Sequence, residues 1–302
     1  MSALQRRGSV VIGFGVAVAA AIASAAGIFA RGSGAFITVT SPRGDTYDMA
    51  TTGVYAYNAQ RVVAEGVGWD IVTLVVAVPA LLLVLPLLAR GSYRGRLFAA
   101  GLLGYFLYQY LEYSVTWAFG PLFLLFVAIY AGSLVGIGWI ARSLAVYGAA
   151  ANDLHDGFPR RGWATLNLFM SGLLVVMWLQ RIALAARGEP GLLLGETTLT
   201  IQALDLGLVV PMSVTAAVLL LRRSALGYPI AAAFGVTFAA MSIAITGMVL
   251  SAWQVEGTFE VAPVVIFGLC AMAAMRLLSR TYRVPALARA HPRIGAPVGS
   301  GT

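Results

Sequence analysis

Several acidic, amide and phenol side chains lie inside apolar stretches of this 302-residue chain. Within residues 97–117, Tyr105, Tyr108, Gln109 and Glu112 follow one another at spacings that place side chains on one face of a helix. A charge in such a stretch is costly and needs a partner or a water-filled space. This face is therefore a candidate site for binding a small polar solute, an ion or a proton.

A second acid, Asp205, lies in residues 199–221, one helical turn after Gln202. At a rise of about 1.5 Å per residue, Glu112 and Asp205 each lie roughly 10 Å inside the same predicted membrane surface. Arg181 ends a further apolar stretch at that surface, and its long side chain can bend toward either carboxylate. We expect a polar pocket in the outer half of the membrane, with Glu112 and Asp205 as its acids and Arg181 as their counter-charge.

The same residues also fit a structural alternative, in which Arg181 pairs with Glu112 or Asp205 only to fix the register of two helices. Two carboxylates that share one arginine leave one negative charge over. Either one acid then holds a proton or a cation joins the group. Asp70, slightly nearer to the outer surface, is a further candidate for the pocket.

The composition requires a lipid environment, because 60% of the residues are apolar and only 11% are charged. That is too little polar surface to cover a water-soluble globule. The apolar residues come in blocks of about 20, the length that crosses a bilayer as a helix. We expect an all-α polytopic transmembrane bundle over residues 1–279. Its spans, about eight, are expected at 9–30, 69–89, 97–117, 121–141, 162–181, 199–221, 228–252 and 260–279.

All 20 basic residues are arginines, and most of them fall at the ends of spans on the side of the N-terminus. The positive-inside rule then predicts that both termini are cytoplasmic, in a bacterial inner (plasma) membrane. As an alternative, Arg6 and Arg7 begin a signal peptide cleaved near Ala23 and Ala25, although the apolar core is longer than such signals have. The next loop lies outside in either case.

Two segments are expected to lie outside the bilayer. Residues 31–68 form a small extracytoplasmic cap, in which 36–40 alternates like a strand, 41–44 has turn composition and 45–49 returns as a second strand. The tail 280–302 mixes arginine with proline and glycine, which is typical of a disordered basic arm near anionic lipid on the cytoplasmic side.

Residue types also exclude several kinds of chemistry. The chain has no lysine, so a retinal Schiff base and a P-loop phosphate site lack their amine. Cys270 is the single cysteine, and His155 and His291 lie near charged loops, so an intrachain disulfide, a cysteine metal cluster and a bis-histidine haem are excluded. We expect the bilayer and a small ligand as partners, with no nucleic acid, metal or cofactor. The oligomeric state is not specified.

Residues 152–156 (NDLHD) match the NDxxD motif with which membrane prenyltransferases hold Mg²⁺ against a diphosphate. Such enzymes need a second acidic cluster on another cytoplasmic loop, and residues 222–227 contain no acid. The motif is therefore interpreted as a hydrated loop.

Two spans resemble each other, which suggests an internal repeat of four helices plus four. Arg90 follows Pro79 at the same distance at which Arg222 follows Pro211, and both spans run in the same direction. The aspartates of these spans fall out of register when the prolines are aligned, so a chance match is the alternative.

Residues 51–58 (TTGVYAYN), 105–113 (YFLYQYLEY) and 203–211 (ALDLGLVVP) resemble a family of bacterial multi-pass membrane proteins to which no activity is attached. The resemblance covers most of the first seven spans. It implies the architecture only.

The leading functional hypothesis is an integral membrane protein that binds or transports a small solute, an ion or a proton through an outward-facing polar pocket. One alternative is a membrane enzyme acting on a lipid or polyprenyl-linked substrate at the outer face, with one carboxylate as general acid or base. Another is a non-catalytic assembly or sensing subunit. The sequence gives no catalytic residue, and an enzyme is the less favoured interpretation.

Overall fold

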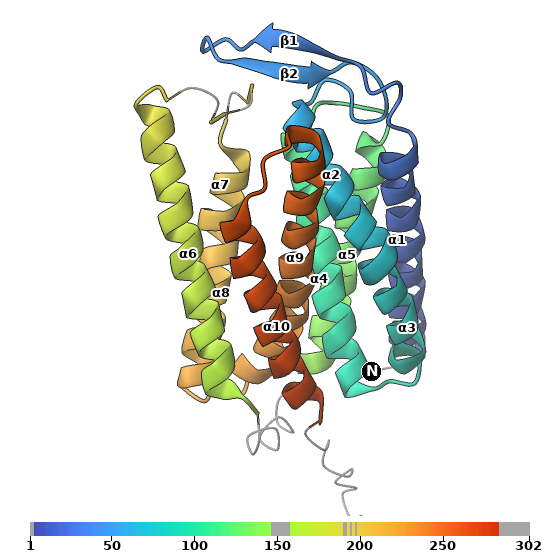
Figure 1. Ribbon diagram of the computed structural model, residues 1–302. Coiled ribbons are helices and arrows are strands. Elements are labelled where there is room, and N and C mark those ends of the chain that lie inside the picture. Colours follow the sequence, from blue (N-terminus) through green and yellow to red (C-terminus); the bar gives the residue numbers. More distant parts are fainter. Residues whose placement is uncertain (1–2, 146–157, 190–191, 194, 197, 284–302) are drawn as a thin grey trace, which may run out of the picture.

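The computed structural model describes residues 3–145, 158–189, 192–193, 195–196 and 198–283. It is an all-α bundle of eight helical rods, as predicted (Figure 1). Six rods are single helices: α1 Ala3–Phe29, α4 Tyr93–Thr116, α5 Phe123–Ala145, α6 Arg160–Ala186, α9 Gly227–Glu256 and α10 Val261–Arg283. The other two each contain a π-helical turn between two α-helices. One consists of α2 Gln60–Val72, η1 Thr73–Ala77 and α3 Val78–Ala89, and the other of α7 Thr200–Leu204, η3 Asp205–Val209 and α8 Val210–Leu221.

Seven of these rods are long and apolar enough to cross a membrane by length and composition. The eighth, α4, has 24 residues, but its sequence carries Arg94, Arg96, Glu112 and several tyrosines. It packs against α3, α5 and α9 and lies in the middle of the bundle with α9 (Figure 1). The most polar rod is thus the one that the others shield.

An antiparallel hairpin covers one end of the bundle, which we call the cap end (Figure 1). Its strands β1 Phe36–Thr40 and β2 Thr46–Ala50 confirm the predicted pair, with Phe36 opposite Ala50. The loop ends earlier than expected, because α2 already begins at Gln60. Its first turns are polar, since Arg61 and Glu65 are ion-paired there, so hydropathy placed the start of the span too late. Residues 284–302 of the expected tail and the 152–156 motif lie outside the described residues.

The structure supports the suspected repeat, because most corresponding elements match in length, although α2 has 13 residues and α7 five, and α4 has 24 and α9 30. Helices α1 and α6 have 27 residues each, η1 and η3 five each, α3 and α8 twelve each, and α5 and α10 23 each. Helix α1 packs on α3 as α6 packs on α8, and α4 packs on α5 as α9 packs on α10. The chain therefore consists of two similarly built halves.

The correspondence extends to individual atoms where α3 and α8 end. When Pro79 is aligned with Pro211, Gly91 aligns with Arg223, and these two residues have positive φ angles of 75° and 55°. The N–H of Ser92 donates to the Leu87 carbonyl at 3.0 Å. At the aligned positions, the N–H of Ser224 donates to the Leu219 carbonyl at 2.9 Å. The same alignment places Thr73 at the position of Asp205, which explains why the aspartates fell out of register.

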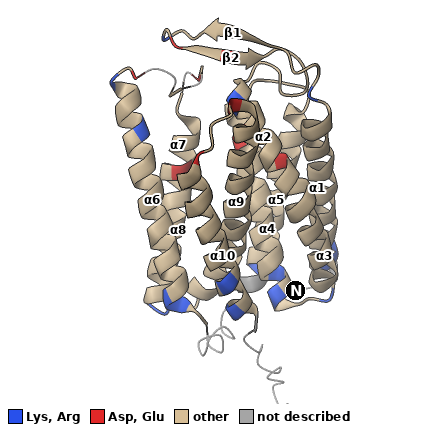
Figure 2. Cartoon of the chain, in the orientation of Figure 1, with Lys and Arg blue, Asp and Glu red and all other residues tan. Residues whose placement is uncertain are grey.

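Charge is divided between the two ends of the bundle (Figure 2). The described carboxylates all lie in the half toward the cap end, whereas most arginines lie at the opposite end, where α1 begins and α10 ends. The acidic candidate residues thus share one half of the molecule.

Candidate functional site

The polar centre of the site is Asp205, the first residue of the π-helical turn η3. Its two carboxylate oxygens accept hydrogen bonds from Tyr108 of α4 and from Nε1 of Trp178 of α6, the latter at 2.8 Å. Such π turns widen a helix by one residue and are frequent at functional sites. Here the turn presents a carboxylate to two neighbouring helices at once.

Glu112 lies one helical turn after Tyr108 on α4. Its side chain is buried in α4, and it interacts electrostatically with Asp205, Glu65 and Glu196. Tyr108 donates its hydrogen bond to Asp205 and interacts only electrostatically with Glu112. Within the described ranges, the Glu112 carboxylate accepts no hydrogen bond. It is thus a buried acid surrounded by other acids.

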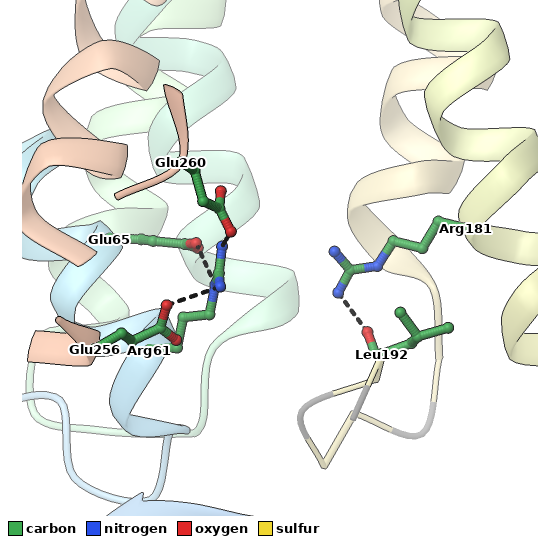
Figure 3. A network of polar contacts seen from close by, with 6 residues as sticks. All are labelled: Arg61, Glu65, Arg181, Leu192, Glu256 and Glu260. Atoms are coloured by element: carbon green, nitrogen blue, oxygen red, sulfur yellow. Dashed lines mark hydrogen bonds and ion pairs between the residues drawn. The ribbon is translucent and has the colours of Figure 1, made fainter. Parts of the chain in front are cut away.

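Arg181 differs from the prediction. Its Nη2 atom donates to the carbonyl oxygen of Leu192, in the loop after α6, and not to Glu112 or Asp205 (Figure 3). The guanidinium acts electrostatically on Glu196 and Glu65. The long side chain reaches a carbonyl of the loop, and helical spacing cannot predict the position of such a partner. The expected counter-charge for the two inner acids is therefore not provided by Arg181.

A second arginine forms the ion pairs that the structure describes, and sequence reasoning missed it. Arg61 of α2 bonds Glu65 at 3.0 Å, Glu256 of α9 at 2.9 Å and Glu260 at 3.0 Å (Figure 3). The acids cluster at predicted span ends on the cap side, which was the available signal. With three carboxylates around one guanidinium, this network adds to the negative charge of the cap half and does not neutralise it.

A cavity of about 290 Å³ opens above these acids at the cap end. It lies between the hairpin segment, the end of α4 and the start of α7, with Thr116, Glu196 and Thr200 among its lining residues. Thr116 lies one helical turn after Glu112, and Thr200 lies about one turn before Asp205. Two residues of the cavity wall thus lie about one helical turn from the two inner acids, which do not line the cavity themselves.

Glu196 is the acid that lines this cavity, and it was not among the expected site residues. Its burial raises the pKa to about 7, an effect that Arg181 opposes and the charge of Glu65 reinforces. Its carboxyl group is thus about half ionised at neutral pH. Because Glu196 also interacts with Glu112, it links the cavity to the inner site electrostatically.

The tyrosine stripe of α4 divides between the two halves of the molecule. Tyr105 and Gln109 contact Thr73, the counterpart of Asp205, at 2.7 and 2.8 Å, whereas Tyr108 contacts Asp205 itself. Tyr105 and Gln109 were expected in the pocket with Glu112, but they form hydrogen bonds to the turn η1 in the first half of the chain. Helix α4 therefore makes hydrogen bonds to both π-helical turns.

Asp70 and Gln202 occupy aligned positions of the two halves and are both buried. Asp70 accepts a hydrogen bond from Tyr55 of the cap loop at 2.5 Å, in a cluster of its own. Gln202 lies three residues before Asp205, and its Oε1 atom has no hydrogen-bond partner among the described residues. Gln202 is therefore an unused acceptor near the site, whereas Asp70 anchors the cap.

Substituting Gly27 by alanine should disrupt the Asp70 cluster. An added Cβ would lie 2.0 Å from Oδ2 of Asp70 and 2.3 Å from the Tyr55 hydroxyl, so these groups would have to move apart. We expect a loss of about 1 to 3 kcal/mol of stability, visible as a lower melting temperature in detergent. Gly15→Ala on the same helix meets nothing within 4 Å and serves as the control. Equal melting temperatures for the two variants would contradict the packing described.

Within the described residues, no group of three His, Cys, Asp or Glu side chains is placed to hold a metal ion. What the site offers is two buried acids, a phenol, an indole and a cavity about one helical turn away from the acids. Searches against protein-family models, curated proteins and solved structures return no match to this chain.

Proposed function

We propose that this chain binds a small solute, an ion or a proton through the cavity at the cap end and carries it across the membrane. The observation that supports this most directly is the position of Glu112. It is a buried carboxylate with no hydrogen bond among the described residues; it interacts electrostatically with Asp205 and lies one turn from Thr116 of the cavity wall. Buried acids in membrane helices mark proton and ion pathways.

The charge balance favours a positively charged occupant. Arg61 is already shared by three carboxylates, and Arg181 donates to a backbone carbonyl. Glu112 and Asp205 therefore have no arginine bonded to them in the described part of the chain. A proton or a cation that enters the cavity would relieve the repulsion between them.

We further propose that the cap end faces the outside of the cell membrane and that both termini are cytoplasmic. The arginines at the opposite end support this orientation, because positive residues are retained on the cytoplasmic side (Figure 2). The cavity would then open outward, and the arginine-rich end would lie against anionic lipid headgroups.

The test measures charge movement in liposomes that contain the purified protein, after a concentration jump of protons, Na⁺, K⁺ or choline. At least one jump should give a saturable current that Glu112→Gln and Asp205→Asn each reduce about tenfold or more. Each variant keeps the side-chain shape and removes only the charge.

Glu189→Gln is the matched control, because Glu189 is an exposed acid near the start of the loop after α6, the loop that also contains Glu196. Its current should equal that of the unchanged protein. If no jump moves charge above the level of empty liposomes, or if Glu112→Gln and Asp205→Asn keep full currents while remaining folded, the proposal that a proton or cation is carried past these acids is wrong.

A further inference from the structure

The walls of the cap-end cavity combine aromatic rings with one carboxylate. Tyr47, Tyr57 and Trp117 line it together with Glu196. The described lining residues include no arginine. Aromatic faces attract cations through the ring quadrupole, and a carboxylate attracts them through its charge. Both kinds of wall therefore favour the same class of ligand.

Local backbone structure holds these groups in place. Gly195 has a φ of 83°, and a Cβ added to it would lie 2.2 Å from Cζ of Tyr47, so the Tyr47 ring lies directly against the residue before Glu196. Tyr57 has a φ of 70°, which is unusual for a residue with a side chain, and its N–H donates to the Ala50 carbonyl at 2.7 Å. The Tyr57 ring is 63% exposed and is free to contact an arriving ligand.

The size of the cavity limits the ligand that it can hold. Thr116 and Thr200 line it beside the aromatic residues and Glu196. The volume of about 290 Å³ lies at the lower end of the range for small-molecule sites, which restricts the ligand to a small one.

We propose that the cap-end cavity binds a small organic cation, whose ammonium group lies against Glu196 and the rings of Tyr47 and Tyr57. This inference rests on the proposed function, because it names the chemical class of the solute that enters toward Glu112 and Asp205. An organic cation fits better than a metal ion, since aromatic carbon provides a cation-binding face but no metal ligand.

The test is isothermal titration calorimetry of the purified protein with choline and with its neutral isostere 3,3-dimethylbutan-1-ol. Choline should bind at least about tenfold more tightly than the isostere, because the two differ mainly in the positive charge. Glu196→Gln should weaken choline binding about tenfold, and Tyr57→Ala should weaken it several-fold. Glu189→Gln, in the same loop, should bind choline as the unchanged protein does.

The pH dependence gives an independent readout. Burial raises the pKa of Glu196 to about 7, with Arg181 of α6 opposing and Glu65 of α2 reinforcing the shift, and Glu112 of α4 also faces it. Below this pKa a proton competes with the cation, so choline should bind about tenfold more tightly at pH 8 than at pH 6. Glu196→Gln should abolish this difference.

Equal affinity for choline and its isostere, or unchanged choline binding by folded Glu196→Gln and Tyr57→Ala, would overturn the inference. Failure here is distinct from failure of the proposed function. Proton currents without choline binding would leave the transport proposal intact and exclude the organic cation. Choline binding that depends on Glu196, without any charge movement, would support the inference and contradict transport.

Discussion

Replacing Gly101 with alanine should prevent α4 and α9 from packing at the centre of the bundle. A Cβ at this position would lie 2.2 Å from the carbonyl oxygen of Ala233 and 2.6 Å from Cβ of Val236. The first of these atoms belongs to the backbone and cannot rotate away. Transmembrane helices associate through such close approaches between small residues.

The same crossing carries an interhelical hydrogen bond, which raises the expected effect. The Thr237 hydroxyl donates to the Gly101 carbonyl at 2.7 Å, so separating the helices to admit a methyl group would also lengthen this bond. We expect a loss of about 3 kcal/mol or more, from overpacking together with the weakened bond. The measurement is the melting temperature of the purified protein in detergent, with size-exclusion chromatography as a second readout.

Gly138→Ala is the matched control for this prediction. Gly138 lies in α5, is exposed on the bundle surface and has no atom within 4 Å of an added Cβ. The melting temperature of the Gly138→Ala protein should be unchanged or slightly higher, because alanine favours helix more than glycine does. A Gly101→Ala protein as stable as Gly138→Ala would show that α4 and α9 do not approach as described.

The helices and the cap hairpin could be predicted because they depend on local patterns. Apolar blocks reveal the spans, and alternation within 36–50 reveals the two strands. Helical rise also predicts that Glu112 and Asp205 lie at a shared depth, and the two acids interact electrostatically in the structure. The partner of Arg181 was not predictable, because it is a loop carbonyl whose position depends on how the chain leaves α6.

Long-range pairing explains most of what the sequence did not reveal. Arg61 bonds Glu256 and Glu260, which lie 195 and 199 residues further along the chain. No spacing rule connects residues that far apart. The π-helical turns that begin at Thr73 and Asp205 lack a reliable local signature apart from the proline that follows each. Their equivalence emerged only when the two halves could be compared in three dimensions.

Substituting Tyr55 by alanine should release the cap loop from the bundle. The Tyr55 side chain is only 4% exposed and makes edge contacts with Trp117 and Tyr113, at ring-centroid distances of 4.4 and 6.2 Å. Its hydroxyl donates to Asp70 at 2.5 Å. Removing a buried aromatic ring of this kind costs about 3 to 5 kcal/mol. We expect a lower melting temperature and faster protease cleavage within residues 51–59.

The hydroxyl and the ring of Tyr55 make separable contributions. Burial and the negative charge of Asp70 raise the pKa of Tyr55 well above its usual range, so the phenol stays protonated and donates throughout the neutral pH range. Tyr55→Phe removes only this hydrogen bond and should therefore cost less than Tyr55→Ala, about 1 to 3 kcal/mol. The acceptor Asp70 would then be left buried without its donor.

Phe119→Ala provides the control for ring removal near the same end of the bundle. Phe119 is 81% exposed, so its truncation should leave both the melting temperature and the cleavage rate of the cap loop nearly unchanged. If Tyr55→Ala behaves like Phe119→Ala in both measurements, the cap is held by other contacts and Asp70 has a role other than anchoring it. That result would return Asp70 to the set of acids available to a ligand.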